Sequence, residues 1–209
     1  MKVAVSYLKS NRSKEETLSL LNKSQTDFVH VDLMDGIFVP ENNLDLEETI
    51  QLLKDCQKPL DIHLMVEDPL KILSKLASLK PAYITIHVEI SNVQECLLEI
   101  KKYHIGCGLA INPETKEDAL YPYLESIDQI LVMSVHPGMG GQTFTPNTVE
   151  KLKILSTLKK ERNLPFLISV DGGINKETIS LVKEYVDRVV SGSFICMNED
   201  YDTQINLLK

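Results

Sequence analysis

Eight short apolar runs, separated by segments with the periodicity of amphipathic helices, constrain the fold of this chain more than any other feature. Each run has the length and the apolar or β-branched content of a strand. A regular alternation of strand and helix predicts a parallel sheet, because parallel neighbours need a long crossover connection. The runs lie at residues 2–8, 28–34, 60–66, 83–89, 106–112, 129–135, 166–172 and 188–193.

The number of alternating units distinguishes a closed barrel from an open sheet. Eight units followed by a helical tail from Glu199 to Lys209 predict an α/β fold closed as a (β/α)8 TIM barrel. The alternative is an open doubly wound sheet, which usually carries a glycine-rich phosphate loop after its first strand. Here the first strand ends in Leu8-Lys9-Ser10, without glycine. We therefore expect one barrel domain over residues 1–209, with no linker and no second domain.

Two sequence signals predict where helices begin. Ser13 with Glu16, and Ser91 with Gln94, have the spacing of a capping box, in which two side chains satisfy main-chain N–H groups at a helix start. We expect helices to begin at both places, after the first and the fourth strands.

Charge and composition exclude several classes of partner. The net charge is −8, with 22 basic and 30 acidic residues spread along the chain. Nucleic acid and anionic membranes need a basic surface, so we expect neither as a partner. An anionic small molecule would have to be held by local chemistry.

Cysteine spacing and the amino-terminal segment bear on the compartment. Cys56, Cys96, Cys107 and Cys196 stand far apart with no CxxC spacing, which is typical of buried thiols in a reducing cytosol. The apolar run near Met1 is too short for a signal peptide, and no run approaches the roughly 18 apolar residues of a membrane span. We expect a cytoplasmic protein.

Polar residues with metal-binding potential stand late in three strands. His30 and Asp32 lie on one face of the second strand, His63 lies late in the third, and Asp171 ends the seventh. Sites in barrels collect at the carboxyl ends of strands, so these residues should meet at one mouth. Two imidazoles and two carboxylates suit one divalent ion such as Zn, Mn, Fe or Co.

Methionines and glycines cluster at the same predicted mouth. Met34, Met65 and Met133 follow or share strands with the polar residues, and we expect them to form an apolar active-site lid rather than only fill the core. Glycine clusters follow the sixth, seventh and eighth strands, where barrels bind phosphate through main-chain N–H groups. These clusters are Pro137-Gly138-Met139-Gly140-Gly141-Gln142, Asp171-Gly172-Gly173 and Ser191-Gly192-Ser193.

With these motifs in place, the sequence resembles the ribulose-phosphate 3-epimerase family from Val5 almost to the last residue. The resemblance implies a (β/α)8 barrel of the ribulose-phosphate binding type. Seven motifs in the family's order carry it. They are HVDLMDGIFVP (30–40), DIHLMV (61–66), ITIHVE (84–89), GLAINPET (108–115), VMSVHPGMGGQTF (132–144), VDGGIN (170–175) and VSGS (190–193).

The resemblance also implies roles for individual residues. His30, Asp32, His63 and Asp171 would bind the catalytic metal, with Asp32 as proton acceptor and Asp171 as proton donor. Ser6 and His63 would contact the sugar. The loop from Gly138 through Met139 and Gly140 to Gly141 would close over the ligand. The phosphate would be held by Gly172, Gly173, Gly192 and Ser193.

The expected activity is therefore a metal-dependent 3-epimerase that interconverts D-ribulose 5-phosphate and D-xylulose 5-phosphate through an enediolate. Inverting a carbon next to a ketone requires acid/base groups on both faces, and two aspartates from different strands can supply them. The partner is a small-molecule ketose phosphate, and no organic cofactor is needed. The resemblance suggests a homo-oligomer.

Several residues depart from the family's pattern and leave alternatives open. Lys9 replaces a small residue and Met139 replaces an aromatic. Ile37 stands where a histidine is common, and His136 stands where Asn, Asp or Glu is usual. The substrate could instead be a hexulose 6-phosphate such as D-allulose 6-phosphate, or the chain could be a non-catalytic phosphosugar-binding paralogue. His87 and Glu89 either orient a ligand histidine or form an ordinary hydrogen-bonded pair inside the barrel.

Overall fold

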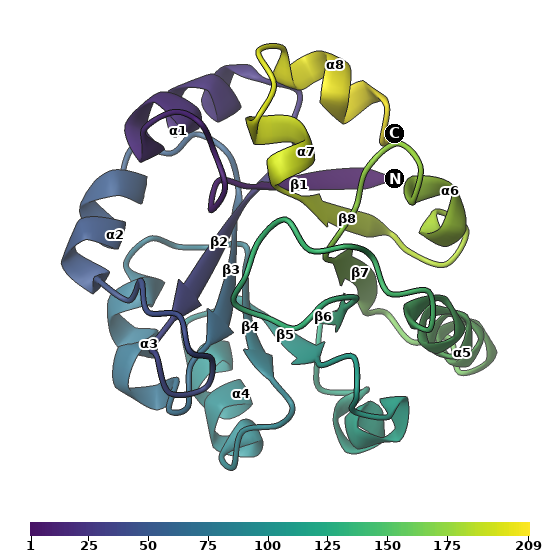
Figure 1. The fold of residues 1–209 in the computed structure, drawn as a ribbon. Helices are drawn as coiled ribbons and strands as arrows, with labels where there is room; N and C mark the ends of the chain where they lie inside the picture. Colours follow the sequence, from purple (N-terminus) through teal and green to yellow (C-terminus); the bar gives the residue numbers. More distant parts are fainter.

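The computed structural model describes all of residues 1–209 and contains a closed barrel of eight parallel strands surrounded by helices (Figure 1). Each strand pairs with the next along the chain, and β1 pairs with β8 to close the barrel. All eight predicted strands are present, so the prediction of a (β/α)8 barrel is confirmed. The strands are β1 (Lys2–Ser6), β2 (Phe28–Met34), β3 (Leu60–Met65), β4 (Tyr83–His87), β5 (Gly106–Ile111), β6 (Gln129–Met133), β7 (Leu167–Asp171) and β8 (Arg188–Ser191).

The helices form the outer layer, and one of them differs from the prediction (Figure 1). Between β5 and β6 the chain forms a 3₁₀-helix, η1 (Glu117–Tyr123), where an α-helix was expected. Pro122 lies inside this segment and lacks the N–H that an α-helix would use. The α-helices are α1 (Lys14–Lys23), α2 (Leu46–Leu53), α3 (Leu70–Ala77), α4 (Val93–Lys102), α5 (Thr148–Glu161), α6 (Ile179–Val182), α7 (Ser193–Cys196) and α8 (Tyr201–Asn206).

One of the two predicted capping boxes is confirmed. The Ser13 hydroxyl accepts from the N–H of Glu16 at 3.2 Å, and the Glu16 carboxylate accepts from the N–H of Ser13 at 3.3 Å. The second box is wrong, because α4 begins one residue later than a Ser91 cap would require. Its N-cap is Asn92, whose side chain makes no capping bond and donates instead to the carboxylate of Asp68.

The main apolar core lies between the strands and the outer helices. Outward-facing strand residues such as Val3, Val29 and Ile62 are fully buried in it, together with helix residues such as Leu73 and Leu97. Because helices cover the outside of the sheet and other strands cover the inside, most strand positions are buried on both faces. This packing holds the strand ends in fixed positions around the mouth.

A layer of charged and polar side chains fills the barrel below the mouth. Arg188, Asp61 and Gln129 are all fully buried. The guanidinium of Arg188 lies 3.0 Å from an Asp61 carboxylate oxygen and donates to the Gln129 amide oxygen, and the Gln129 amide donates to Asp61 at 3.2 Å. The same guanidinium packs over the rings of Phe28 and Tyr83. The interior of the barrel is therefore an ionic layer as well as an apolar one.

Three aspartates connect neighbouring strands at the opposite end of the barrel from the mouth. Each one directly precedes a strand and bonds twice to a single residue of the preceding strand: its N–H donates to that residue's carbonyl, and its carboxylate accepts from that residue's N–H, at 2.8–3.0 Å. We call these contacts the aspartate ties. The pairs are Asp27 with Val3, Asp128 with Cys107, and Asp187 with Ile168.

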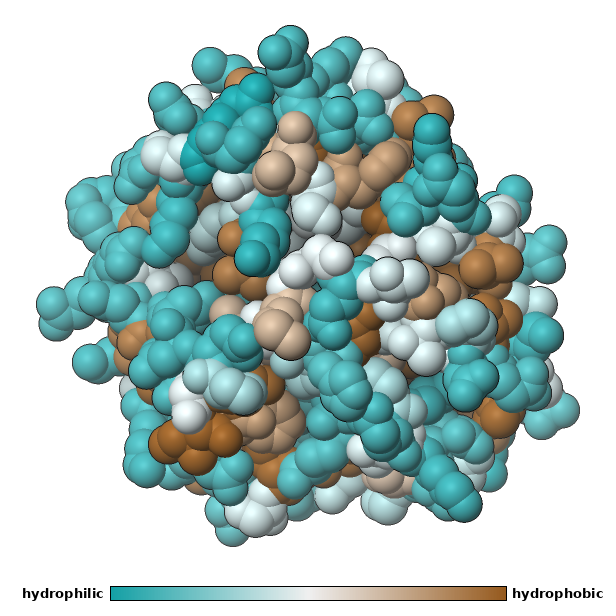
Figure 2. Space-filling model, in the orientation of Figure 1, coloured by the Kyte–Doolittle hydropathy of each residue, from teal (hydrophilic) through white to brown (hydrophobic).

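The helices are too short or too polar to cross a membrane, and the face of the molecule in Figure 2 is largely hydrophilic. No helix of the structure combines the length and the apolar character needed to cross a bilayer. On the face of Figure 2, hydrophilic residues surround a paler centre, where the chain crosses the front of the barrel in Figure 1. This centre is the mouth of the barrel.

Candidate active site

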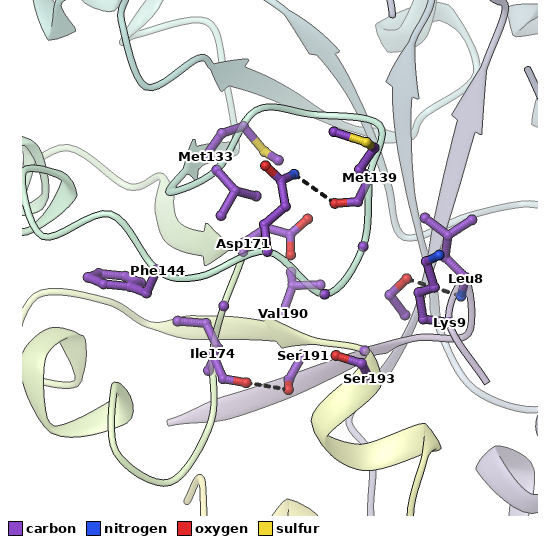
Figure 3. Close-up of a pocket in the computed structure, with 18 of the residues that line it drawn as sticks. Leu8, Lys9, Met133, Met139, Phe144, Asp171, Ile174, Val190, Ser191 and Ser193 are labelled. Atoms are coloured by element: carbon purple, nitrogen blue, oxygen red, sulfur yellow. Dashed lines mark hydrogen bonds between the residues drawn. The ribbon is translucent and has the colours of Figure 1, made fainter. Parts of the chain in front are cut away.

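A cavity of about 450 Å³ lies at the carboxyl-terminal ends of the strands (Figure 3). Most of the predicted site residues line it. His30, His63 and Met34 do not line it, and they are buried around it with at most 2% of their surface exposed. The predicted residues that line the cavity are Ser6, Asp32, Met65, Met133, Gly138, Met139, Gly140, Gly141, Asp171, Gly172, Gly173, Gly192 and Ser193.

The four predicted metal ligands meet beside this cavity. One ligand atom from each of His30, Asp32, His63 and Asp171 lies within 4.8 Å of the others. Nε2 of His30 and Nδ1 of His63 are each 3.2 Å from the same oxygen of Asp32, and Nε2 of His30 is 3.9 Å from Asp171. The residues come from β2, β3 and β7, so closure of the barrel brings them together. The cluster could hold a metal ion.

The orientation of His30 supports a cation at this place. Its Nδ1 lies 2.7 Å from a carboxylate oxygen of Asp61, which turns Nε2 toward the cluster. Nε2 is fully buried and makes no hydrogen bond in the protein. A buried polar atom without a partner is costly, and a metal ion would satisfy it. The donor set and this orphaned nitrogen fit a divalent ion.

The pKa values of the two carboxylates in the cluster are shifted in opposite directions. Burial and the negative charge of Asp32 raise the pKa of Asp171 to about 7. Burial also acts to raise the pKa of Asp32, but the close contacts of its carboxylate with His30 and His63 hold that pKa well below its usual range. Two carboxyl groups whose environments separate their pKa values can carry and accept a proton at the same pH. The pair has the chemistry of a proton donor and a proton acceptor.

Ser6 connects β1 to this pair. Its hydroxyl donates to the second oxygen of Asp32 at 2.7 Å, and it also accepts from the N–H of Leu8. Ser6 thereby holds the oxygen of Asp32 that the two histidines do not contact. Ser6 therefore lies within reach of anything that contacts Asp32 in the cavity.

The loops after β7 and β8 form the other wall of the cavity. The N–H groups of Gly173 and Gly192 donate no hydrogen bond within the protein. Gly173 has a φ of +62°, and a Cβ at this position would lie 2.4 Å from the main-chain nitrogen of Phe144. Only glycine fits this turn, which brings free main-chain donors to the cavity. The wall suits an anion such as a phosphate.

The loop after β6 crosses the mouth, as Figures 1 and 3 show. The amide of Gln142 donates to the carbonyl oxygens of His136 and Met139 at 2.7 and 2.8 Å, which stabilises the turn between them. Gly140 packs against the side chain of Lys9, because a Cβ at Gly140 would lie 2.5 Å from Lys9 Cγ. The loop is therefore stabilised by bonds within itself and by its contact with Lys9.

The methionines do not share one position. Met65 and Met133 line the cavity with 2% and 3% of their surface exposed. Met34 lies behind them in a small cluster with Met65 and Val39. Met139, on the loop, is 55% exposed.

Two residues that position the site were not predicted from the sequence. Asp61 holds His30, and Arg188 holds Asp61 through a buried ion pair. A signal for Asp61 exists, because it stands two residues before His63 and must share its inward face. Nothing in the sequence indicates that Arg188 turns inward, since a cationic side chain at a strand start usually reaches solvent.

Comparisons with known proteins give matches over nearly the whole chain. The model of the ribulose-phosphate 3 epimerase family matches residues 2–196. The ribulose-phosphate 3-epimerase of Helicobacter pylori (strain ATCC 700392 / 26695) is 40% identical over 208 residues, which cover 96% of this chain and 93% of that protein. The ribulose-phosphate 3-epimerase of Aquifex aeolicus is 34% identical over 196 residues, covering 93% and 88%.

More distant solved structures show the fold alone. The tryptophan synthase A-subunit of Pyrococcus furiosus superposes with a TM-score of 0.71 at 14% identity and covers 99% of this chain and 96% of its own. Phosphoribosyl anthranilate isomerase of Thermococcus kodakaraensis has a TM-score of 0.64 at 16% identity, with coverage of 99% and 96%. Both support the barrel architecture.

Fold, site and relatives together define the class of this protein as a barrel enzyme that is an isomerase. The similarity extends over nearly the whole chain and is not confined to the mouth. The chain belongs to the ribulose-phosphate 3 epimerase family.

Proposed function

We propose that this chain is a metal-dependent 3-epimerase that interconverts D-ribulose 5-phosphate and D-xylulose 5-phosphate. The observation that carries the proposal is the pair Asp32 and Asp171, two carboxylates from β2 and β7 that meet beside the unpartnered Nε2 of His30. A binding protein has no need for such a pair. Membership of the family and the names of the relatives support the same reaction.

The ion would be held by His30, Asp32, His63 and Asp171, and one divalent ion of Zn, Mn, Fe or Co suits these nitrogen and oxygen ligands. When bound, it supplies Lewis-acid polarisation of the sugar's ketone and hydroxyl oxygens. No organic cofactor enters the proposal, because proton transfer next to a ketone needs only acid/base groups and charge stabilisation.

The two aspartates would transfer the proton. Asp32 takes the proton from C3 of the substrate on one face, and the electron pair delocalises onto the ketone as an enediolate. Asp171 returns a proton to C3 on the other face, which inverts the carbon. The hydrogen bond from Ser6 keeps one Asp32 oxygen occupied, so the other oxygen is directed to its partners in the cluster. In the reverse reaction the two aspartates exchange roles.

The rest of the cavity would hold the substrate in place. The main-chain N–H groups at Gly172, Gly173, Gly192 and Ser193 would bind the phosphate, which suits a protein with an acidic net charge. Ser6 and His63 would contact the sugar. The loop from Gly138 through Met139 and Gly140 to Gly141 would cover the ligand, and Met34, Met65 and Met133 would keep water from the carbanion.

A deuterium-exchange assay tests the proposal. Metal-loaded protein is incubated with ribulose 5-phosphate in D₂O, and we expect deuterium at C3 together with xylulose 5-phosphate. Asp32→Asn keeps the side-chain volume and should lower both rates by roughly 10²–10⁴-fold, the usual worth of a general base. The matched control is Asp118→Asn, the same change on the exposed surface of η1. Absence of exchange in the unaltered protein would refute the proposal.

The same assay with D-allulose 6-phosphate tests the hexulose alternative. His136 and Met139 line the cavity, whereas Ile37 does not and is 74% exposed. If the hexulose is turned over faster, His136 and Met139 are the residues to exchange first. Tight binding of either sugar without turnover would favour the phosphosugar-binding paralogue. The homo-oligomer remains a prediction, to be checked by light scattering.

A further inference from the structure

We infer that Glu89 and His87 are positioning residues that determine which ring nitrogen of His63 is free to bind the metal. The inference rests on the proposed function, because it assigns the metal to the cluster that contains His63. It concerns two side chains outside that cluster. Neither residue lines the cavity.

The three side chains form a continuous hydrogen-bonded row that leads away from Asp32. Nδ1 of His63 lies 3.2 Å from Asp32, and Nε2 of His63 lies 2.8 Å from Nε2 of His87. Nδ1 of His87 lies 3.1 Å from Oε2 of Glu89. Both histidine side chains are fully buried, and the Glu89 side chain is 20% exposed. The row therefore runs from the cluster to the edge of the barrel.

A main-chain N–H group holds the carboxylate of Glu89 in place. Its other oxygen, Oε1, accepts the N–H of Asn112 at 2.8 Å. Oε2 then accepts the proton on Nδ1 of His87, since a carboxylate offers only acceptors. Burial favours the neutral form of the His87 imidazole, which carries a single ring proton, so with that proton on Nδ1 the Nε2 of His87 is a bare acceptor.

This fixes the proton on His63. Two ring nitrogens 2.8 Å apart need one donor and one acceptor, so Nε2 of His63 donates to the bare Nε2 of His87. The lone pair on Nδ1 of His63 is then turned toward Asp32 at 3.2 Å, a contact between two acceptors that a bound metal ion would relieve. For His30 a single partner has the same effect on the other ring nitrogen. Asp61 accepts the proton of Nδ1, so Nε2 is left free for the metal.

The variant Glu89→Gln reverses this order of donors and acceptors. A glutamine has one oxygen, and the N–H of Asn112 needs it. The amide NH₂ group would then face Nδ1 of His87, which must become an acceptor, and the ring proton of His87 moves to Nε2. The Nε2–H of His87 would then point at Nε2 of His63. This disfavours the tautomer of His63 that is protonated on Nε2, which is the one that leaves Nδ1 free for the metal.

Two measurements test the inference. Long-range ¹H–¹⁵N NMR of the metal-free protein should report the Nδ1–H tautomer of His87 in the unaltered chain and the Nε2–H tautomer in Glu89→Gln. Zinc titration by calorimetry should show a Kd about 10–100-fold weaker for Glu89→Gln, the usual effect of removing such a partner. Glu95→Gln, the same change on the exposed face of α4, should leave both readouts unchanged.

The following results would overturn the inference or the proposed function. An Nε2–H tautomer of His87 in the unaltered chain, or equal zinc affinity for Glu89→Gln, overturns the inference. If Glu89→Gln fails to fold by circular dichroism, His87→Phe removes the acceptor and keeps an aromatic ring, and unchanged zinc affinity in it overturns the inference. Zinc binding without epimerisation refutes only the proposed function, whereas an unaltered chain that binds no zinc refutes both.

Discussion

Replacing Arg188 by methionine tests whether the ionic layer inside the barrel is a structural requirement. Arg188 and Asp61 are both fully buried, 3.0 Å apart, and far from water that could screen an unpaired charge. Methionine is apolar and similar in length, so the substitution removes the guanidinium without leaving a large cavity. The carboxylate of Asp61 then keeps only Gln129 and His30 as partners.

The size of the effect follows from the loss of one partner of a buried pair. Such a loss costs about 3–5 kcal/mol, because the remaining charge is buried without compensation. In a chain of this length 1 kcal/mol shifts Tm by about 2–4 °C, so Arg188→Met should lower Tm by about 6–20 °C. The stacking of the guanidinium on Phe28 and Tyr83 is lost as well, which acts in the same direction.

Differential scanning calorimetry measures this shift. The control is Lys160→Met, a change at an exposed residue near the end of α5, which should change Tm by less than about 2 °C. The double variant with Asp61→Asn should be more stable than the sum of the single effects predicts, by about 0.5–3 kcal/mol. A Tm loss no larger than that of the control, or strictly additive effects, would show that the pair does not stabilise the barrel.

Three further predictions concern other parts of the chain. Gly173→Ala should destabilise the protein by about 1–2 kcal/mol through the left-handed φ, and should raise KM by displacing Phe144, as thermal melts and steady-state kinetics would show. Lys151→Met removes three bonds from a buried ammonium to main-chain carbonyls and should cost about 2–3 kcal/mol in denaturant unfolding. Burial raises the pKa of the Cys196 thiol to about 12, so iodoacetamide at pH 8 should leave it unmodified until the protein unfolds, as mass spectrometry would detect.

Matched positions provide the controls for these predictions. Gly141 also has a positive φ but open space around it, so Gly141→Ala should share the strain of Gly173→Ala without its effect on Phe144. Lys153→Met, on the exposed side of α5, should not alter stability measurably. The reasoning would be contradicted if Gly141→Ala raised KM as much as Gly173→Ala, or if Lys153→Met destabilised the protein as much as Lys151→Met. It would also be contradicted if Cys196 in the native protein were alkylated as fast as the partly exposed Cys56.

The barrel could be predicted from the sequence because its strands are buried on both faces and read as continuous apolar runs. The helix starts were harder to predict. The Ser13 box forms as expected, but Asn92 displaces the Ser91 cap by one residue, and the segment containing Pro122 is a 3₁₀-helix. Local propensity does not decide such boundaries when tertiary contacts compete with it.

The candidate site could be predicted as far as single strands allow. The alternation of side chains places Asp32 and His30 on one face, and the barrel rule places them at one mouth. The partners that orient them could not be predicted, because contacts across the interior depend on the stagger of the closed sheet. Arg188 meets Asp61 only after β8 has closed on β1, and no local pattern encodes that meeting.

The aspartate ties imply that the barrel has an internal repeat of two strands. They occur between β1 and β2, β5 and β6, and β7 and β8, always at the end away from the mouth. In the remaining pair, Ala82 donates its N–H to Leu60 in the same way but has no carboxylate to accept in return. The barrel can thus be described as four similar quarters, one of them incomplete. Installing the missing acceptor by Ala82→Asp should raise the free energy of unfolding by about 0.5–1.5 kcal/mol without altering the mouth.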